Sequence, residues 1–414
     1  MFKQLTSSAL ACYAAIVAAL VSPTTTDALA QGRKALIQAR NRMVDTEIVA
    51  AGVKNRRVIA AMRKTPRHEF VQFPQRKYAY LDMALPIGHG QTISPPFIVA
   101  YMTEQIDPKP TDRILEIGTG SGYQAAVLSG LAGEVYSVEI VEPLGLKAAQ
   151  TLKRLHCDNV KTKIGDGFEG WPEYAPFDKI IVTCSPERIP RPLVAQLKEG
   201  GRMIVPVGER YQQVFYMLTK RDGKLKLEAL RPTLFVPMTG QAESYREVMP
   251  DPSNPEIRNG NFEEMVSKEK IAAGWHYQRQ LEIVEDVESP FGNHYAKFTN
   301  SIPGKGCRAL QGFPVDGRTV KSLKVKMFVK GKDIRPGYPK NSLPHVMITF
   351  YDEKRAMLRT SRIGPWLGTF DWQMEKANID VPILAREAII HIGLFGAVGE
   401  LCFDGIEMTA IRKK

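Results

Sequence analysis

The sequence predicts an α/β domain built on a doubly wound parallel sheet with an antiparallel edge, followed by an all-β domain. Short apolar segments first alternate with helix-like segments, a proline-rich stretch follows, and only strand-like segments come after it. Such alternation is typical of a parallel sheet covered by helices on both faces, whereas short strands separated by turns are typical of a β-sandwich. A length of 414 residues also exceeds what one ordinary core accommodates, so two domains are expected.

The N-terminus has the composition of a secretory signal peptide. Lys3 supplies a positive start, the segment 9–21 is almost entirely apolar, and residues 28–30 (Ala-Leu-Ala) form a small-x-small cleavage site. We therefore expect residues 1–30 to be removed after Ala30 and the protein to be exported to the periplasm or the extracellular space. An uncleaved anchor is the alternative, but the apolar run is short for a bilayer, and no permanent membrane span is expected.

The first domain, residues 31–250, begins with a charged helical stretch and continues with the α/β alternation. The helical stretch covers 32–61 and stops before Pro66, which cannot continue a helix. The expected buried strands are 113–117, 134–140, 160–164, 179–182 and 202–207, and the expected helices are 123–131, 143–155 and 193–198. Two further strands, 213–219 and 225–230, flank an Asp-Gly pair typical of a hairpin, so the sheet should end in antiparallel strands.

The second domain, residues 259–414, follows a linker at 251–258 where prolines gather with Ser, Asn and Asp. Its expected strands are 294–299, 320–329, 346–351, 388–394 and 406–411. Turn residues separate them and no helix of convincing length is predicted, which indicates a jelly-roll-like β-sandwich. Cys307 and Cys402 are the one pair that we consider for a disulfide, and we favour two unpaired core thiols instead.

The basic residues do not form a nucleic-acid-binding segment. The formal net charge is +12, which permits contact with nucleic acid or anionic surfaces. However, the lysines and arginines are scattered along the chain without a long basic block. We therefore expect a generally basic, solvated exterior and no nucleic-acid partner.

A glycine-rich segment directly after the first predicted strand indicates a ligand site. Gly118, Gly120 and Gly122 alternate with Thr119 and Ser121, and a predicted helix follows. Glycines at such a position let the backbone turn sharply and approach a ligand without Cβ clashes. The spacing differs from the G-x-G-x-x-G that cradles a pyrophosphate, so it suits a ligand without phosphates.

Three acidic residues near the ends of predicted strands support the same site. Glu116 is available to an amino-acid moiety, and Glu139 ends the second strand, where a carboxylate can accept both hydroxyl protons of a ribose. Asp166 and Gly167 follow the third strand and are placed to meet an adenine edge. Ligands of open α/β sheets bind at strand ends where the strand order reverses. A solvent-facing Glu or a turn-forming Asp-Gly explains each residue singly, but together they indicate a cofactor site.

Five motifs lie in a recognisable order between Met43 and Gly240. They are Pro66-Arg67-His68-Glu69-Phe70-Val71, the segment 85–96 (LPIGHGQTISPP), Gly170-Trp171-Pro172, Gly200-Gly201-Arg202 and Phe235-Val236-Pro237. In this order they resemble the protein-L-isoaspartate O-methyltransferase family. The chain departs from the family at Pro95, where Gln or Ala is usual, and at 183–187, where a Thr-Ala-Ala-Ala run is usual. The second departure borders the substrate side, so it affects fine specificity rather than the reaction.

The resemblance implies a Rossmann-like class I methyltransferase fold with S-adenosyl-L-methionine as cofactor. The methyl group would pass by in-line displacement to the α-carboxylate of an isoaspartyl residue in damaged proteins or peptides, which is ionised at pH 7 and needs no general base. Ser94 matches the family's active-site serine and would orient that carboxylate, while Thr92, Ile93 and Val207 would line the peptide channel. The implied cofactor-binding residues are Glu116, Gly118, Thr119, Gly120, Gly122, Glu139, Asp166 and Gly167.

The second domain carries a weaker resemblance. Segments 259–263, 274–275 and 401–406 are similar to the ends of galactose-binding-like and carbohydrate-binding β-sandwich modules. In such modules oxygen ligands near the first and last strands often hold a structural calcium, and Glu263 and Asp404 are the candidates here; ordinary turn and surface residues are the alternative. Trp366 and Trp372 can stack on sugar faces, which makes a polysaccharide a candidate partner, although core packing is the commoner fate of tryptophan.

Two functional hypotheses stay open on sequence grounds. The methyl donor is made inside cells, whereas a signal peptide directs the protein out of the cytoplasm. The alternative to an active enzyme is therefore an exported binding protein with a vestigial methyltransferase domain and a carbohydrate-binding β-sandwich. The donor-binding and acceptor-binding residues named above are all present, which favours the enzyme. All of them precede Gly240, so we expect methyl transfer to be independent of the second domain.

Overall fold

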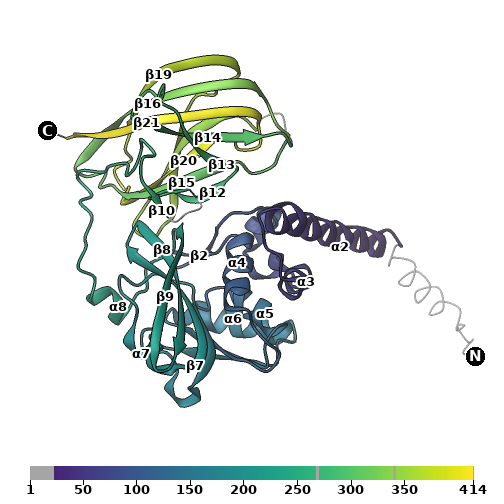
Figure 1. Ribbon diagram of the computed structural model, residues 1–414. Coiled ribbons are helices and arrows are strands. Elements are labelled where there is room, and N and C mark those ends of the chain that lie inside the picture. Colours follow the sequence, from purple (N-terminus) through teal and green to yellow (C-terminus); the bar gives the residue numbers. More distant parts are fainter. Residues whose placement is uncertain (1–22, 267–269, 339–341, 414) are drawn as a thin grey trace, which may run out of the picture.

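The computed structural model describes residues 23–266, 270–338 and 342–413 (Figure 1). The part drawn in purple to teal surrounds a seven-stranded sheet with helices, and the part drawn in green to yellow contains two five-stranded sheets. An α/β domain followed by an all-β domain is therefore confirmed. Most of the expected signal peptide, residues 1–22, lies outside the described residues.

The N-terminal helical stretch is interrupted. Helix α2 (Pro23–Met43) continues into the π-helical turn η1 (Val44–Val49), and a separate helix α3 (Arg56–Lys64) follows. The break contains Gly52, with a φ of 101°, and Asn55, whose side chain accepts two backbone N–H groups of the first turn of α3. An asparagine that satisfies these donors starts a new helix. The single helix expected from the sequence is therefore wrong at this break.

The expected cleavage point after Ala30 lies within α2, which extends away from the rest of the chain in Figure 1. Cleavage there would leave a shorter helix that begins at Gln31. Within the ranges that the structure describes, no helix is long and apolar enough to cross a membrane. Export and cleavage stay predictions.

Two short strands and a helix that the sequence did not predict lie between α3 and the main sheet. The 3-10 turns η2 (Arg67–Phe70) and η3 (Phe73–Tyr78) come first. Strands β1 (Leu85–Gly88) and β2 (Gln91–Ile93) then pair antiparallel, and α4 (Pro96–Ile106) follows them. His89 and Gly90 connect the two strands with φ values of 54° and 69°. Strands of three or four residues show too little periodicity to be recognised in a sequence.

The central sheet of the first domain has the order β5-β4-β3-β6-β7-β8-β9. The strands are β3 (Arg113–Ile117), β4 (Glu134–Glu139), β5 (Val160–Ile164), β6 (Phe177–Val182), β7 (Leu197–Glu209), β8 (Gln212–Arg221) and β9 (Lys224–Thr233). The first five strands in this order are parallel and the last two antiparallel, as the sequence predicts. The chain moves from β3 toward β5 on one side and resumes at β6 on the other. The strand order therefore reverses beside β3, where open α/β sheets bind ligands.

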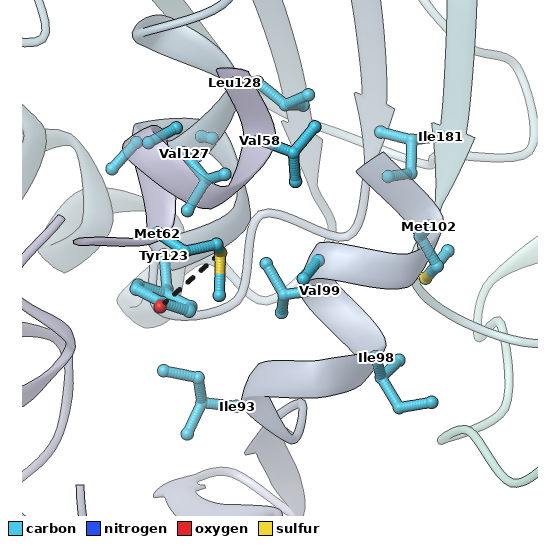
Figure 2. Packing of buried hydrophobic residues seen from close by; sticks show 14 of the residues in the cluster. Val58, Met62, Ile93, Ile98, Val99, Met102, Tyr123, Val127, Leu128 and Ile181 are labelled. Carbon is cyan, nitrogen blue, oxygen red and sulfur yellow. Dashed lines mark hydrogen bonds between the residues drawn. The ribbon is translucent and has the colours of Figure 1, made fainter. Parts of the chain in front are cut away.

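Helices cover both faces of this sheet. They include α5 (Tyr123–Ser129), α6 (Glu142–Arg154), α7 (Arg191–Gln196), the 3-10 turn η4 (Pro172–Tyr174) and the short α8 (Gln241–Ser244). Because side chains alternate along a strand, Ile114 of β3 joins the larger core cluster and Leu115 joins the smaller one. Figure 2 shows part of the larger cluster, where Val58 of α3, Val99 of α4 and Tyr123 of α5 come together.

The second domain consists of two antiparallel sheets around one core. One sheet has the order β12 (His276–Arg279), β15 (Arg308–Pro314), β20 (Glu387–Gly393), β17 (His345–Tyr351), β18 (Met357–Ile363). The other has the order β13 (Leu281–Glu285), β14 (His294–Asn300), β21 (Val398–Arg412), β16 (Val320–Arg335), β19 (Gly368–Asp380); β10 (Met265–Val266) pairs with β11 (Ile271–Ala272). Ile390 of the first sheet and Phe403 of the second belong to one buried cluster, which is the arrangement of a β-sandwich.

The two cysteines considered for a disulfide are unpaired. Cys307 precedes β15 and Cys402 lies on β21 of the other sheet, and both thiols are free and buried. Burial raises the pKa of each thiol to about 12, so both are neutral at physiological pH. The favoured expectation of two core thiols is confirmed.

The domains contact each other along β12 and β15 of the sandwich. The Tyr277 hydroxyl donates to the Leu234 carbonyl oxygen at 2.9 Å, and His276 Nε2 lies 3.0 Å from the Tyr211 carbonyl oxygen. A carbonyl oxygen only accepts, so the imidazole donates in the second contact. A Cβ at Gly312 would lie 3.0 Å from the Tyr211 ring, so a glycine permits this close approach. The second domain is therefore docked against β8 and β9.

Candidate active site

A pocket opens at the carboxyl ends of β3 and β4, the point where the strand order reverses. It encloses about 840 Å³, part of which is open solvent. Its walls come from residues 91–94, 117–121, 138–141, 183–184 and 236–239, together with Val99, Met102, Tyr123, Gln124 and Gly167. Segments far apart in the sequence thus meet in one cavity.

The glycine-rich loop forms one wall of the pocket and requires its glycines. Gly118, Gly120 and Gly122 have φ values of 92°, 54° and 88°. A Cβ at Gly118 would lie 2.5 Å from Thr183 Oγ1, which donates to the Gly118 carbonyl oxygen at 2.7 Å. The Gly118 N–H donates to the Val138 carbonyl oxygen at 2.8 Å. The loop is therefore held from β4 and β6, and its backbone faces the cavity without a Cβ between.

Glu139 ends β4 and lines the pocket with both carboxylate oxygens engaged. Oε2 accepts the Gly120 N–H at 2.7 Å, and Oε1 accepts the Val141 N–H at 2.8 Å. Its exposed fraction is 5%, so the carboxylate is fixed and largely desolvated. A carboxylate has about four acceptor positions, so two remain for hydroxyl groups of a ligand.

Glu116 lies beneath the glycine loop and is not among the residues that line the pocket. Its Oε2 accepts the Ser137 hydroxyl at 2.5 Å, and that hydroxyl also bonds the Thr119 hydroxyl at 2.6 Å. Its Oε1 is buried without a hydrogen-bond partner among the described residues. Complete burial, assisted by the charge of Glu139, raises the pKa of Glu116 to about 8. The carboxyl group therefore supports the loop and does not face the cavity.

Asp166 also differs from its expected place. Its Oδ1 accepts the Phe168 N–H at 2.9 Å, and its Oδ2 accepts the Gln241 N–H at the start of α8 at 2.7 Å. Gly240, with a φ of 77°, packs so closely on this carboxylate that a Cβ would collide with it. Asp166 therefore ties the loop after β5 to α8, and Gly167 is the member of the pair that lines the pocket.

The predicted acceptor residues Thr92, Ile93 and Ser94 lie on β2 and directly after it, on the wall opposite the glycine loop. The Ser94 hydroxyl makes no hydrogen bond to any other described residue and is partly exposed. It is therefore available to a ligand. Val207 instead lies on β7, packs against the smaller core cluster and does not line the pocket.

One wall of the pocket was missed on sequence grounds. The Ser185 N–H donates to the Val236 carbonyl oxygen at 2.8 Å, and the Met238 N–H donates to the Ser185 carbonyl oxygen at 2.9 Å. These bonds bring 183–184 beside 236–239. Segment 236–239 overlaps the Phe235-Val236-Pro237 motif and 183–187 was expected to border the substrate side, but nothing in the sequence showed that the two segments meet. Burial raises the pKa of the neighbouring Cys184 thiol far above its ordinary value, so this group is neutral.

The two calcium candidates in the second domain are occupied by hydrogen-bond donors. Glu263 accepts the N–H of Asn293 at 2.6 Å and bonds His294 through N–H and Nδ1 at 2.8 and 2.6 Å. Asp404 accepts the Ser289 hydroxyl and two backbone N–H groups at 2.6–2.8 Å. A calcium ion binds to free oxygen lone pairs, and hydrogen-bond donors already occupy most lone pairs of these two carboxylates. Across the described ranges, no group of three or more His, Cys, Asp or Glu side chains is suited to a metal.

The two tryptophans proposed to stack on sugars differ in exposure. Trp366 is 6% exposed, donates to Glu375 Oε1 at 3.2 Å and lies edge-on to Phe403 in the core. The commoner fate of a tryptophan, packing in the core, is therefore confirmed for Trp366, and its ring is not available to a sugar. Trp372 is partly exposed and lies edge-on to Tyr295, with ring centroids 5.3 Å apart.

Residues 38–243 match the family model described as protein-L-isoaspartate(D-aspartate) O-methyltransferase. A protein-L-isoaspartate O-methyltransferase of Opitutus terrae is 53% identical over 207 residues, which cover 50% of this chain and 89% of the relative. One of Gloeobacter violaceus is 52% identical over 198 residues, which cover 48% of this chain and 97% of the relative. A solved structure of a putative enzyme of that name from Plasmodium falciparum, in complex with S-adenosyl-L-homocysteine, matches at 26% identity with a TM-score of 0.44, covering 48% of this chain and 98% of that chain.

Proposed function

The chain belongs to the protein-L-isoaspartate(D-aspartate) O-methyltransferase family, and from this premise we propose how its first domain performs that reaction. The domain is an S-adenosylmethionine-dependent methyltransferase that acts on the α-carboxylate of L-isoaspartyl residues in damaged proteins and so initiates their repair. The observation that carries the proposal is the single pocket in which the glycine loop and Glu139 face Ser94.

The residues of this pocket fit the methyl donor. The glycine loop brings backbone groups to the cavity without side chains between, and Glu139 retains acceptor positions for two ribose hydroxyls. Gly167 and the apolar residues of 138–141 supply a surface for the adenine. When bound, S-adenosylmethionine supplies an electrophilic methyl group. Glu116 then acts from beneath the loop, as support for Thr119, rather than by contact with the donor.

Ser94 orients the acceptor. The isoaspartyl carboxylate is ionised at neutral pH, so the protein has no proton to remove and its task is alignment. The Ser94 hydroxyl lines the cavity on the acceptor side without a hydrogen-bond partner among the described residues, and it can donate to one carboxylate oxygen. Thr92 and Ile93 border the path of the peptide. The neutral Cys184 thiol places no second negative charge beside the carboxylate.

The test is methyl transfer to matched peptides. Wild-type protein is incubated with S-adenosylmethionine and a peptide that contains isoaspartate or, as control, aspartate at the same position. We expect S-adenosylhomocysteine to form with the isoaspartyl peptide alone. Donor binding without any turnover would instead support the vestigial-domain alternative.

Export remains part of the proposal. The apolar N-terminal run and the Ala-Leu-Ala site support secretion, and cleavage after Ala30 would start the mature chain at Gln31 within α2. Fractionation of a bacterial host that expresses the full gene, followed by N-terminal mass analysis, tests this. A cytoplasmic product that still begins at residue 1 would contradict it.

A second candidate function is attachment to a polysaccharide through the second domain. It is supported by the partly exposed Trp372, its neighbour Tyr295, and Lys330, whose ammonium lies 6.0 Å from the Trp372 ring. Such aromatic surfaces stack on sugar rings. Lys330 is paired with Asp371 at 3.1 Å, and an acidic sugar would compete with this aspartate for the ammonium group. Full-length protein should co-sediment with an insoluble acidic polysaccharide, and Trp372→Ala should abolish this while Trp366→Phe does not. Equal sedimentation of Trp372→Ala and wild type would exclude the surface around Trp372 as the polysaccharide-binding site.

A further inference from the structure

The acceptor segment, which we define as residues 82–97, is held by the second domain at three places along its length. It contains β1, β2, Ser94 and the first turn of α4. The contacts fall at Asp82 before β1, at Gly90 in the turn between the strands, and at Phe97 in α4. The segment that carries the acceptor residues is therefore bordered by a domain that the family match does not cover.

Asp82 supplies a helix cap that the local sequence lacks. Helix α4 begins after Pro95, which has no side-chain oxygen to accept the first backbone N–H groups. Asp82 Oδ1 accepts the Phe97 N–H at 2.9 Å instead. Asp82 therefore satisfies a first-turn donor of α4, which begins two residues after Ser94. Val99 and Met102 of the same helix also line the pocket.

Arg279 of β12 holds Asp82 from the second domain. Its Nη2 lies 2.6 Å from Asp82 Oδ2, and the two side chains are only 12% and 10% exposed. Its guanidinium also lies 3.7 Å from the centroid of the Phe97 ring. One arginine thus contacts both the capping carboxylate and the helix that is capped. A guanidinium suits both contacts, because it is planar, always charged and able to stack on a ring.

Further charged side chains surround this pair. Arg308 of β15 donates to the Asp82 carbonyl oxygen at 2.7 Å, and Glu47 of η1 is close to Asp82 and both arginines. Burial first, and then the charge of Asp82, raise the pKa of Glu47, while the two arginines lower it. Removal of one partner from a buried cluster leaves the charges of the others uncompensated, which is strongly destabilising. The contact between Arg279 and Asp82 is therefore favoured over arrangements in which they separate.

The turn between β1 and β2 meets the second domain independently. A Cβ at Gly90 would lie 3.5 Å from the backbone carbonyl oxygen of Lys354, in the loop between β17 and β18. This loop is not part of the Arg279 cluster. Two separate surfaces of the sandwich therefore border the acceptor segment, one at its ends and one at its turn.

We propose that Arg279 is a positioning residue for methyl transfer: through Asp82 it fixes the acceptor segment, so the second domain completes the acceptor side of the active site. This rests on the proposed function for its kinetic consequence, and it replaces the expectation that methyl transfer is independent of the second domain. Arg279 touches neither substrate nor donor pocket. Its effect is on the alignment of Ser94 and α4, to which transfer rates are sensitive.

The test uses the full chain with Arg279→Gln, Arg279→Lys and Asp82→Asn. Arg279→Gln should raise the KM for an isoaspartyl peptide about tenfold, because the acceptor segment samples misaligned positions. Its dissociation constant for S-adenosylhomocysteine should stay unchanged, because the donor wall lies on β3 and β4. Arg279→Lys keeps the charge and should recover part of the loss. Asp82→Asn combined with Arg279→Gln should be no worse than the poorer single variant, since both break one contact.

Arg258→Gln is the matched control. Arg258 forms another ion pair between the domains, with Glu209 at 2.9 Å, and does not contact the acceptor segment. Hydrogen exchange of backbone amides in 85–97 should accelerate in Arg279→Gln and not in Arg258→Gln. If both variants show the peptide KM and exchange of wild type, the proposal is overturned. Failure of wild type to methylate the peptide would sink the proposed function, whereas the exchange comparison would still decide whether Arg279 fixes the segment.

Discussion

The two domains differ in how they treat buried polar groups. In the first domain, Glu139 retains acceptor positions toward the pocket, and Glu116 keeps one oxygen without a partner. In the second domain, Asp404 is buried and Glu263 is half-buried, and each carboxylate already accepts three donors from within that domain. Acidic residues occur at strand ends in both domains, but of these four carboxylates only that of Glu139 lines the active-site pocket, with two acceptor positions left.

This difference shows what separates a binding residue from a structural one. A buried carboxylate is costly unless hydrogen bonds compensate it, so most are satisfied within the protein. Where the fold leaves acceptor capacity beside a cavity, a ligand can complete the set. The same residue type at a similar position in the chain therefore carries no functional meaning until its partners are known.

The largest expected effect tests whether the second domain has a structural core of its own. Trp275 is fully buried, stacks on Phe262 at 5.5 Å and donates to the Asn259 carbonyl oxygen at 3.0 Å. Trp275→Ala should lower the free energy of unfolding by about 3–5 kcal/mol, because it leaves a large cavity. Chemical denaturation followed by fluorescence of the remaining tryptophans measures this. If the variant still binds S-adenosylhomocysteine like wild type below its unfolding transition, the core of the second domain is not required for donor binding.

Glu139→Ala tests the open carboxylate of the first domain. Loss of charge-assisted hydrogen bonds to the ribose should weaken S-adenosylhomocysteine binding by about 1.5–3 kcal/mol in calorimetry. Glu142→Ala is the control, since Glu142 makes the same charge change at the exposed start of α6. Equal affinities of both variants and wild type would remove Glu139 from the site.

Glu116 provides a pH test of the same comparison. Its pKa is raised from 4.5 to about 8 in the folded protein, so the folded state holds the proton more tightly than the unfolded chain. The resulting stability is present below pH 4.5 and is lost as the pH rises through about 8. Between about pH 5 and about pH 8.5, the free energy of unfolding should therefore fall less in Glu116→Gln than in wild type, by roughly 1–3 kcal/mol. Thermal unfolding at several pH values measures this. Parallel curves would show that burial does not shift this group.

Ser94→Ala should affect turnover and spare donor binding. The hydroxyl orients the ionised acceptor carboxylate, so turnover on an isoaspartyl peptide should fall about 10- to 100-fold, which corresponds to the roughly 1.5–3 kcal/mol of a hydrogen bond to a charged group. Affinity for S-adenosylhomocysteine should not change, because Ser94 lies on the acceptor wall. Steady-state assays with saturating donor separate the two effects, and wild-type turnover in the variant would exclude this role.

The smallest expected effect concerns the closed carboxylates of the second domain. Because N–H and O–H donors occupy Glu263 and Asp404, the melting temperature should be the same in calcium and in a chelator. Differential scanning calorimetry under both conditions measures this. A rise with calcium would show that a cation displaces these donors, and the contrast between the domains would fail.

The sequence determined the features that depend on neighbouring residues. Apolar runs placed β3, β4, β5 and β6 to within two residues and the start of β7 five residues too late, and the Asp-Gly pair placed the hairpin between β8 and β9. The alternate glycines placed the loop after β3, since only glycine readily adopts φ values such as 92° at Gly118. These are local properties of the chain, so a pattern within a short window is enough to reveal them.

Only the tertiary structure decided which side chains act together. It buried Trp366, turned Asp166 toward α8 and away from the cavity, and brought Arg279 to Asp82 across 197 residues of sequence. It also supplied an acceptor for the first turn of α4, because Pro95 at the capping position has none and Asp82 Oδ1 accepts the Phe97 N–H instead. The physical reason is that burial and charge pairing depend on what packs from elsewhere in the chain. A sequence pattern shows which residue type stands at a position, but it does not show which distant residue packs against it.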